Sequence, residues 1–122
     1  MSIPSLSGEW VSTYHYHDGV DSSRHTILFE QDELLMNGIS QSQPDDSVLS
    51  FTLAFDVENR ALTGTWRETT STAGQYKGRV FHGAVQFLLN AELNHARGKW
   101  VGYNSDNSVV NTGEWELQKS QP

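Results

Sequence analysis

The stretch Ser47-Val48-Leu49-Ser50-Phe51-Thr52-Leu53-Ala54-Phe55 alternates along its whole length. Every second residue from Leu49 to Phe55 is Leu or Phe, and the residues between them are smaller or polar. Successive side chains of a β-strand point to opposite faces of the sheet, so this pattern predicts a strand with one face in a core.

Seven further stretches carry the same kind of alternation, and turn-forming residues separate them at fairly even spacing. This pattern predicts an all-β fold, a single antiparallel up-and-down β-barrel of about eight strands spanning residues 1–122, with a β-sandwich as the alternative. Closure into a barrel would remove the exposed sheet edges. The predicted strands are Gly8–His17, Arg24–Gln31, Leu34–Gln41, Ser47–Phe55, Ala61–Thr70, Tyr76–Asn90, Arg97–Tyr103 and Val109–Gln118.

Composition excludes several kinds of function. The 122 residues include no cysteine, which rules out disulfides, thiolate zinc sites and cysteine nucleophiles. Eight Lys and Arg against fifteen Asp and Glu give a net charge of −7, which disfavours a nucleic-acid partner. No apolar run is long enough to span a membrane, and the first residues carry no signal-peptide pattern, so we expect a cytoplasmic protein with no membrane partner.

All four tryptophans follow a glycine by two residues. In a strand, positions i and i+2 share a face, so each indole should lie beside an empty site on the same side. Alternation of large and small residues suits the tapering interior of a small barrel. The four rings are therefore expected inside the barrel, either as core fillers or as the walls of a ligand cavity. The four motifs are Gly8-Glu9-Trp10, Gly64-Thr65-Trp66, Gly98-Lys99-Trp100 and Gly113-Glu114-Trp115.

The repeated Gly-x-Trp strands resemble those of the calycin superfamily of ligand-binding barrels, which includes the lipocalins and avidins. Over nearly the whole chain, the sequence also resembles an uncharacterised barrel domain found C-terminal to helix-turn-helix regulators in actinobacteria. The resemblance implies a sensor or binding module, but this chain has no helix-turn-helix, so a regulator function does not carry over. The segments that carry it are Leu62–Thr70, Gly74–Gly78, His82–Gln86, Gly98–Gly102 and Asn111–Leu117.

Several polar and aromatic residues join the tryptophans as candidate lining of the interior. Glu68 shares a strand face with Trp66, and a buried carboxylate needs a partner, for which His82, Tyr76, Arg67 or a ligand are candidates. His25 shares a face with Ile27 and Phe29. The full set of predicted ligand-binding residues is Trp10, Tyr14, Tyr16, His25, Trp66, Glu68, Tyr76, His82, Gln86, Trp100 and Trp115.

These features favour a small-molecule-binding barrel that holds an apolar or aromatic ligand, with no cofactor and no metal. One alternative is a protein-interaction module that uses its outer surface. Another is an isomerase or cyclase using Glu68 and His82, although no nucleophile, phosphate or dinucleotide motif is present and no catalytic residue is assigned. The strand Tyr76–Asn90 is apolar on both faces, and its residues Phe81, Val85, Phe87 and Leu89 would form an outward patch that favours a homo-oligomer.

Overall fold

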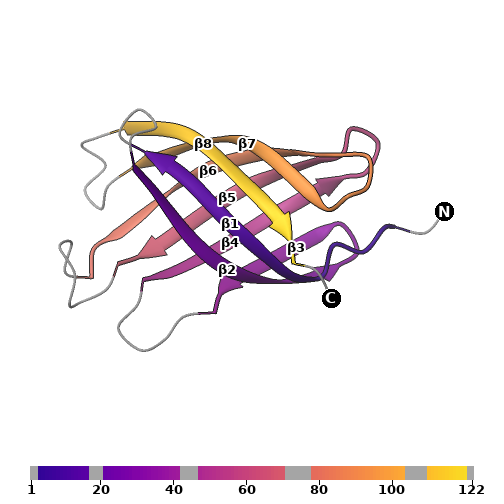
Figure 1. The fold of residues 1–122 in the computed structure, drawn as a ribbon, viewed down its shortest axis with the longest axis horizontal. Coiled ribbons are helices and arrows are strands. Elements are labelled where there is room, and N and C mark those ends of the chain that lie inside the picture. The colour runs from indigo at the N-terminus through magenta and orange to yellow at the C-terminus, as the bar shows by residue number, and fades with distance from the viewer. Residues whose placement is uncertain (1–2, 17–20, 42–46, 71–77, 104–109, 121–122) are drawn as a thin grey trace.

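The computed structural model describes residues 3–16, 21–41, 47–70, 78–103 and 110–120 (Figure 1). The described residues form eight antiparallel strands in chain order around one closed barrel, as predicted, and not a sandwich. The ring is closed by pairing between the first and last strands, from Trp10 opposite Lys119 to Tyr14 opposite Trp115. The strands are β1 (Gly8–Tyr16), β2 (Asp21–Asp32), β3 (Leu35–Ser40), β4 (Val48–Asp56), β5 (Ala61–Thr69), β6 (Val80–Leu89), β7 (His95–Tyr103) and β8 (Val110–Lys119).

The alternation predicted in the sequence becomes the inside and outside of the barrel. In β4, each Leu and Phe from Leu49 to Phe55 is buried, whereas Thr52 and Ala54 are exposed. One face of every strand therefore contributes to a single core, which is the expected result for a sheet that closes on itself. No helix in the described ranges is long and apolar enough to cross a membrane.

The strand register places three of the four Gly-x-Trp tryptophans opposite a glycine of a neighbouring strand. In the β7–β8 pair, Trp100 lies opposite Gly113 and Gly98 lies opposite Trp115. Two antiparallel strands that carry the same motif therefore place each indole across from the other strand's glycine. Trp66 on β5 likewise lies opposite a glycine, Gly83 of β6. Each of these three rings consequently has a small neighbour across the strand pair as well as along its own strand.

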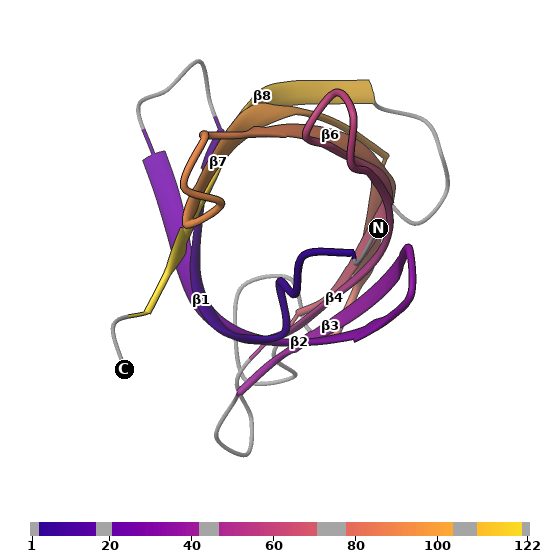
Figure 2. The same cartoon turned by 90° about the vertical axis from the view of Figure 1, so that its right-hand side faces the viewer.

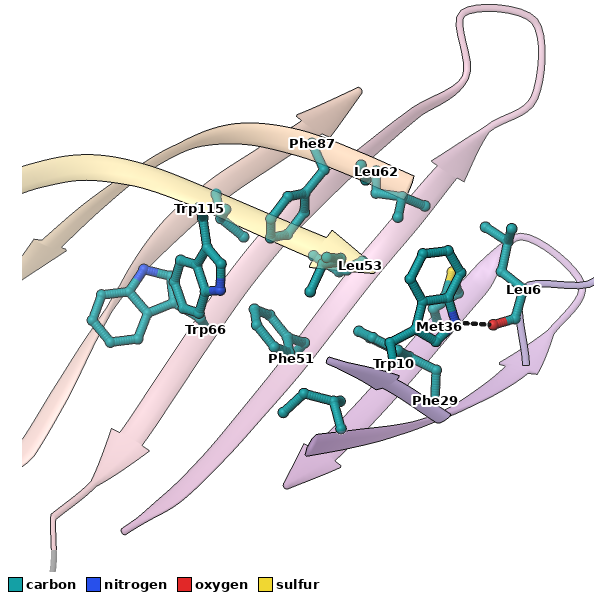
Figure 3. Close-up of a cluster of buried hydrophobic side chains, with 14 of the residues drawn as sticks. Leu6, Trp10, Phe29, Met36, Phe51, Leu53, Leu62, Trp66, Phe87 and Trp115 are labelled. Atoms are coloured by element: carbon teal, nitrogen blue, oxygen red, sulfur yellow. Dashed lines mark hydrogen bonds between the residues drawn. The ribbon is translucent and has the colours of Figure 1, made fainter. Parts of the chain in front are cut away.

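Aromatic rings fill the middle of the barrel (Figure 3). The Trp115 ring lies with its centroid 5.0 Å from that of Phe51, 5.6 Å from that of Trp66 and 6.0 Å from that of Phe87. These centroid distances fall within the range of favourable aromatic pairs. Phe51 also contacts Phe29, so rings from β2, β4, β5, β6 and β8 form one continuous cluster.

One end of the barrel is closed by the segment that precedes β1. In Figure 2, this indigo segment lies across part of the barrel end that faces the viewer. Leu6 is fully buried, and its carbonyl oxygen accepts a hydrogen bond of 2.9 Å from the Trp10 indole nitrogen. The Leu6 backbone N–H donates to the Gln31 side-chain oxygen, which fixes the segment to β2. The turns after β2, β4 and β6 lie at this same end, because alternate connections of an up-and-down barrel share an end.

The structure corrects the predicted strand Tyr76–Asn90. The strand β6 begins at Val80, after Gly78 with its positive φ of 80°, and Tyr76 lies outside the described residues. Val85, Phe87 and Leu89 are buried in the barrel core, and Phe81 packs against that core from a partly buried position. These four residues therefore do not form the expected outward patch on β6, and the homo-oligomer stays a prediction.

Candidate functional site

The end of the barrel opposite the Leu6 segment carries a polar cluster that faces inward. Tyr14 of β1, His25 of β2 and Glu68 of β5 converge there. The Tyr14 hydroxyl donates to the Glu68 carboxylate, at 2.9 Å from Oε1 and 3.2 Å from Oε2. The His25 Nε2 atom lies 3.7 Å from Glu68 Oε2 and 3.1 Å from the hydroxyl oxygen of Ser47.

The three side chains come together because of the closed topology. Tyr14 lies two positions after Ser12 on the inner face of β1, and Glu68 lies two positions after Trp66 on the inner face of β5. These strands are not adjacent in the sheet, so the Tyr14–Glu68 hydrogen bond spans the barrel interior. Across the sheet, Glu68 lies opposite Leu49 on one side and Phe81 on the other, so its neighbours along the wall are apolar.

Burial and the neighbouring carboxylate change the acidity of Tyr14. Burial is the largest cause and raises the pKa of the phenol well above its ordinary value of 10.0. The negative charge of Glu68 raises this pKa further, and a hydrogen bond with Ser23 partly offsets the increase. Tyr14 is therefore held in its protonated form, in which it donates a hydrogen bond to Glu68.

Aromatic rings surround the cluster. Tyr14 stacks on the His25 ring, with centroids 6.3 Å apart and planes 11° from parallel. Its other face and edges meet Tyr16, Trp100 and Trp115 at centroid distances of 5.7, 6.3 and 5.0 Å. The polar groups thus lie among ring faces and edges.

The four indole N–H groups are all used within the protein. Trp66 donates to the Val101 carbonyl oxygen, Trp100 to the His15 carbonyl oxygen and Trp115 to the Ser12 hydroxyl oxygen. Trp10 donates to the closing segment described above. The tryptophans therefore offer ring surface to a ligand and no free donor. Ser12 was not among the predicted site residues, although its place in the β1 alternation marks it as an inward polar residue.

The predicted lining residues divide between the two ends of the barrel. Trp10 is 1 % exposed and lies at the closed end, and Trp115 is equally buried in the middle. Trp66 and Trp100 are 8 % and 6 % exposed and lie nearer the polar cluster. Tyr14, Tyr16 and His25 are partly buried at that end, and the Glu68 side chain there is 11 % exposed. We call this end, defined by Tyr14, Tyr16, His25, Glu68, Trp66 and Trp100, the polar end.

Two predicted lining residues face outward instead. His82 and Gln86 are exposed on β6, because the inward positions of this strand are Gly83, Val85 and Phe87. His82 lies opposite Arg67, and Gln86 donates a hydrogen bond to the Thr63 hydroxyl oxygen. The predicted Glu68–His82 pair therefore does not form, and within the described ranges the partners of Glu68 are Tyr14 and His25.

His82 belongs to an open hollow on the outer wall. The hollow has a volume of about 630 Å³ and lies over β5, β6 and β7. The rings of His82 and Tyr103 flank it with centroids 5.6 Å apart, and Arg67 and Thr65 form the β5 side. Trp66, one of the residues that define the polar end, also lines this hollow.

Among the described residues, no group of three or more His, Asp or Glu side chains is arranged to hold a metal ion. No protein-family model matches the chain, and no curated protein matches it.

Proposed function

We propose that this chain is a calycin-like barrel that binds a small apolar or aromatic molecule at its polar end. The observation that carries the proposal is the asymmetry of the interior. Apolar side chains and the Leu6 segment fill one end. The polar cluster of Tyr14, His25 and Glu68 lies at the other end. Mostly apolar walls with a few placed polar groups are typical of small-molecule sites.

Solvent access supports the same location. Inward-facing side chains are inaccessible in a fully packed barrel, and Trp10 and Trp115 follow that rule at 1 % exposure. At the polar end, the side chains of His25 and Glu68 retain 10 % and 11 % of their accessible surface. A molecule entering the barrel from this end would meet these side chains first and the rings of Trp66 and Trp100 next.

The proposal is tested by thermal melting and intrinsic tryptophan fluorescence across a panel of small apolar and aromatic compounds. A ligand present at a hundred times its dissociation constant stabilises the folded state by about 2.7 kcal/mol. For a chain of this length, that raises the melting temperature by about ten degrees.

A matched pair of variants locates the site. In Trp66→Phe the fluorescence change on binding should shrink, because the removed indole lies at the polar end. In Trp10→Phe it should persist, because that indole lies at the closed end. Flat curves across the whole panel would contradict the proposal and favour a protein partner on the outer surface. A signal lost in Trp10→Phe alone would contradict the proposed location.

A further inference from the structure

The geometry points to a ligand with a positively charged nitrogen, an amine or quaternary ammonium on an apolar body, whose charge is bound by the Glu68 carboxylate among the aromatic rings of the polar end. This inference rests on the proposed function and specifies its ligand class. It follows from the charge of Glu68, from the partners that Glu68 has and from the rings around it.

Glu68 is the only Asp, Glu, Lys or Arg among the buried residues of the described ranges. A buried carboxylate is costly unless it is paired with an opposite charge and hydrogen-bonded. Within the described ranges, no Lys or Arg nitrogen lies within ion-pair distance of it. Its one hydrogen-bond donor there is the Tyr14 hydroxyl, whereas a carboxylate offers about four acceptor sites. The site therefore has acceptor capacity and negative charge to offer to a ligand.

A protonated His25 would compete with a cationic ligand for the Glu68 carboxylate. Its Nε2 atom is 3.7 Å from Glu68 Oε2, close enough for an ion pair when the imidazole is protonated, and it also lies 3.1 Å from the Ser47 hydroxyl oxygen. A neutral imidazole contributes no counter-charge. A cationic ligand would supply one at the same carboxylate, so binding should be measured where histidines are generally neutral.

The aromatic rings around Glu68 would also attract a positively charged ligand. A cation is attracted to the faces of Trp, Tyr and Phe within about 6 Å of the ring centroid. Phe81 lies directly across the strand pair from Glu68, and Trp66 lies two residues before it on the same face. Tyr14, the hydrogen-bond donor, packs against Trp100 and Trp115. A carboxylate with aromatic rings on several sides suits an ammonium group that continues into an apolar body.

The opposite charge is disfavoured at the same place. An anionic ligand would approach Glu68 without a described Lys or Arg to neutralise it. The net charge of −7 would repel it during approach and attract a cation. A neutral ligand would not neutralise the carboxylate. We therefore expect a ligand with a charged nitrogen to bind more tightly than a neutral ligand of the same shape.

The test compares three probes with one aromatic body: 2-phenylethylammonium, neutral 2-phenylethanol and anionic phenylacetate. Dissociation constants are measured by tryptophan fluorescence at about pH 8, above the ordinary titration range of histidine. The wild-type protein should bind the ammonium at least about tenfold more tightly than the alcohol, and the phenylacetate most weakly.

Two variants assign the preference to the buried carboxylate. Glu68→Gln should bring the ammonium and the alcohol to similar affinity. Glu114→Gln removes the same unit of charge from the exposed face of β8 and should keep the wild-type preference. Equal affinity for ammonium and alcohol in the wild-type protein, or an ammonium preference retained in Glu68→Gln, would overturn the inference and leave the proposed function standing. Absence of binding by these probes and by the whole apolar panel would overturn both.

Discussion

Tyr14 is a partly buried phenol whose hydroxyl donates a hydrogen bond to the Glu68 carboxylate. Burial and the charge of Glu68 raise its pKa, so the unfolded chain should ionise this tyrosine at lower pH than the folded protein does. A group with a folded pKa above its unfolded value contributes stability that is present below the unfolded pKa and is lost as pH rises above it. We therefore expect Tyr14 to favour folding below about pH 10 and to lose this effect above it.

Tyrosinate absorbance tests this expectation by comparison of the wild-type protein with Tyr14→Phe. At about pH 11, the two native proteins should show the same amount of ionised tyrosine, because the residue that differs is still protonated. In denaturant at the same pH they should differ by one tyrosinate. A difference of one tyrosinate between the native proteins would contradict the pKa increase.

For single residues, the sequence predicted which side chains face the interior better than it predicted which side chains contact one another. Tyr14, His25 and Glu68 were each predicted as lining from the alternation of their own strands. Their mutual contacts depend on the curvature that carries β1 and β5 across the interior from one another. No local pattern encodes that curvature, so the sequence did not pair Glu68 with Tyr14 or His25. The partners it suggested were His82, Arg67, a ligand and Tyr76, the last of which lies outside the described residues.

Among the elements, β6 and β7 show why glycine is needed in a barrel wall. A Cβ atom added at Gly98 would overlap the backbone carbonyl oxygen of Gln86 on β6. Glycine in a strand interior is typical of such close backbone approach. We expect Gly98→Ala to destabilise the protein by about 1 to 3 kcal/mol, as overpacked substitutions do. Lys99→Ala, on the exposed face of the same strand, should change stability by less than about 0.5 kcal/mol.

Chemical denaturation of both variants measures these free energies of unfolding. Equal stability of Gly98→Ala and the wild-type protein would show that β6 and β7 can separate without cost. That result would remove close backbone approach as the reason for glycine at this position.

The prediction for β6 was wrong about which of its residues face the barrel interior. Counting alternation from Tyr76 placed His82 and Gln86 inside, but the regular strand starts only at Val80. A turn at Gly78 precedes it, and a turn breaks the two-residue period that the counting assumed. Exposed Leu88 and partly buried Val80 made the outer face look as apolar as the inner one, so hydrophobicity alone did not correct the phase.

For the whole molecule, the regular spacing of turns and the apolar alternation were enough to predict eight strands and closure. Both properties recur along the chain, so an error in one strand does not change the predicted fold. The closed end was not predicted, because the residues before β1 carry no periodic pattern. Leu6 is buried through contacts with β1 and β2 that only the folded barrel creates.

The Leu6 segment should therefore contribute strongly to the stability of the whole barrel. Leu6→Ala removes a fully buried side chain where the backbone is held by Trp10 and Gln31, so the cavity cannot easily collapse. We expect a loss of about 2 to 5 kcal/mol in the free energy of unfolding. Leu34→Ala makes the same substitution at 47 % exposure in the turn after β2 and should cost less than about 0.5 kcal/mol. Because a small barrel has only about 5 to 15 kcal/mol of stability, the first variant should also melt at clearly lower temperature. Equal losses in the two variants would mean that the segment covers the barrel without stabilising it.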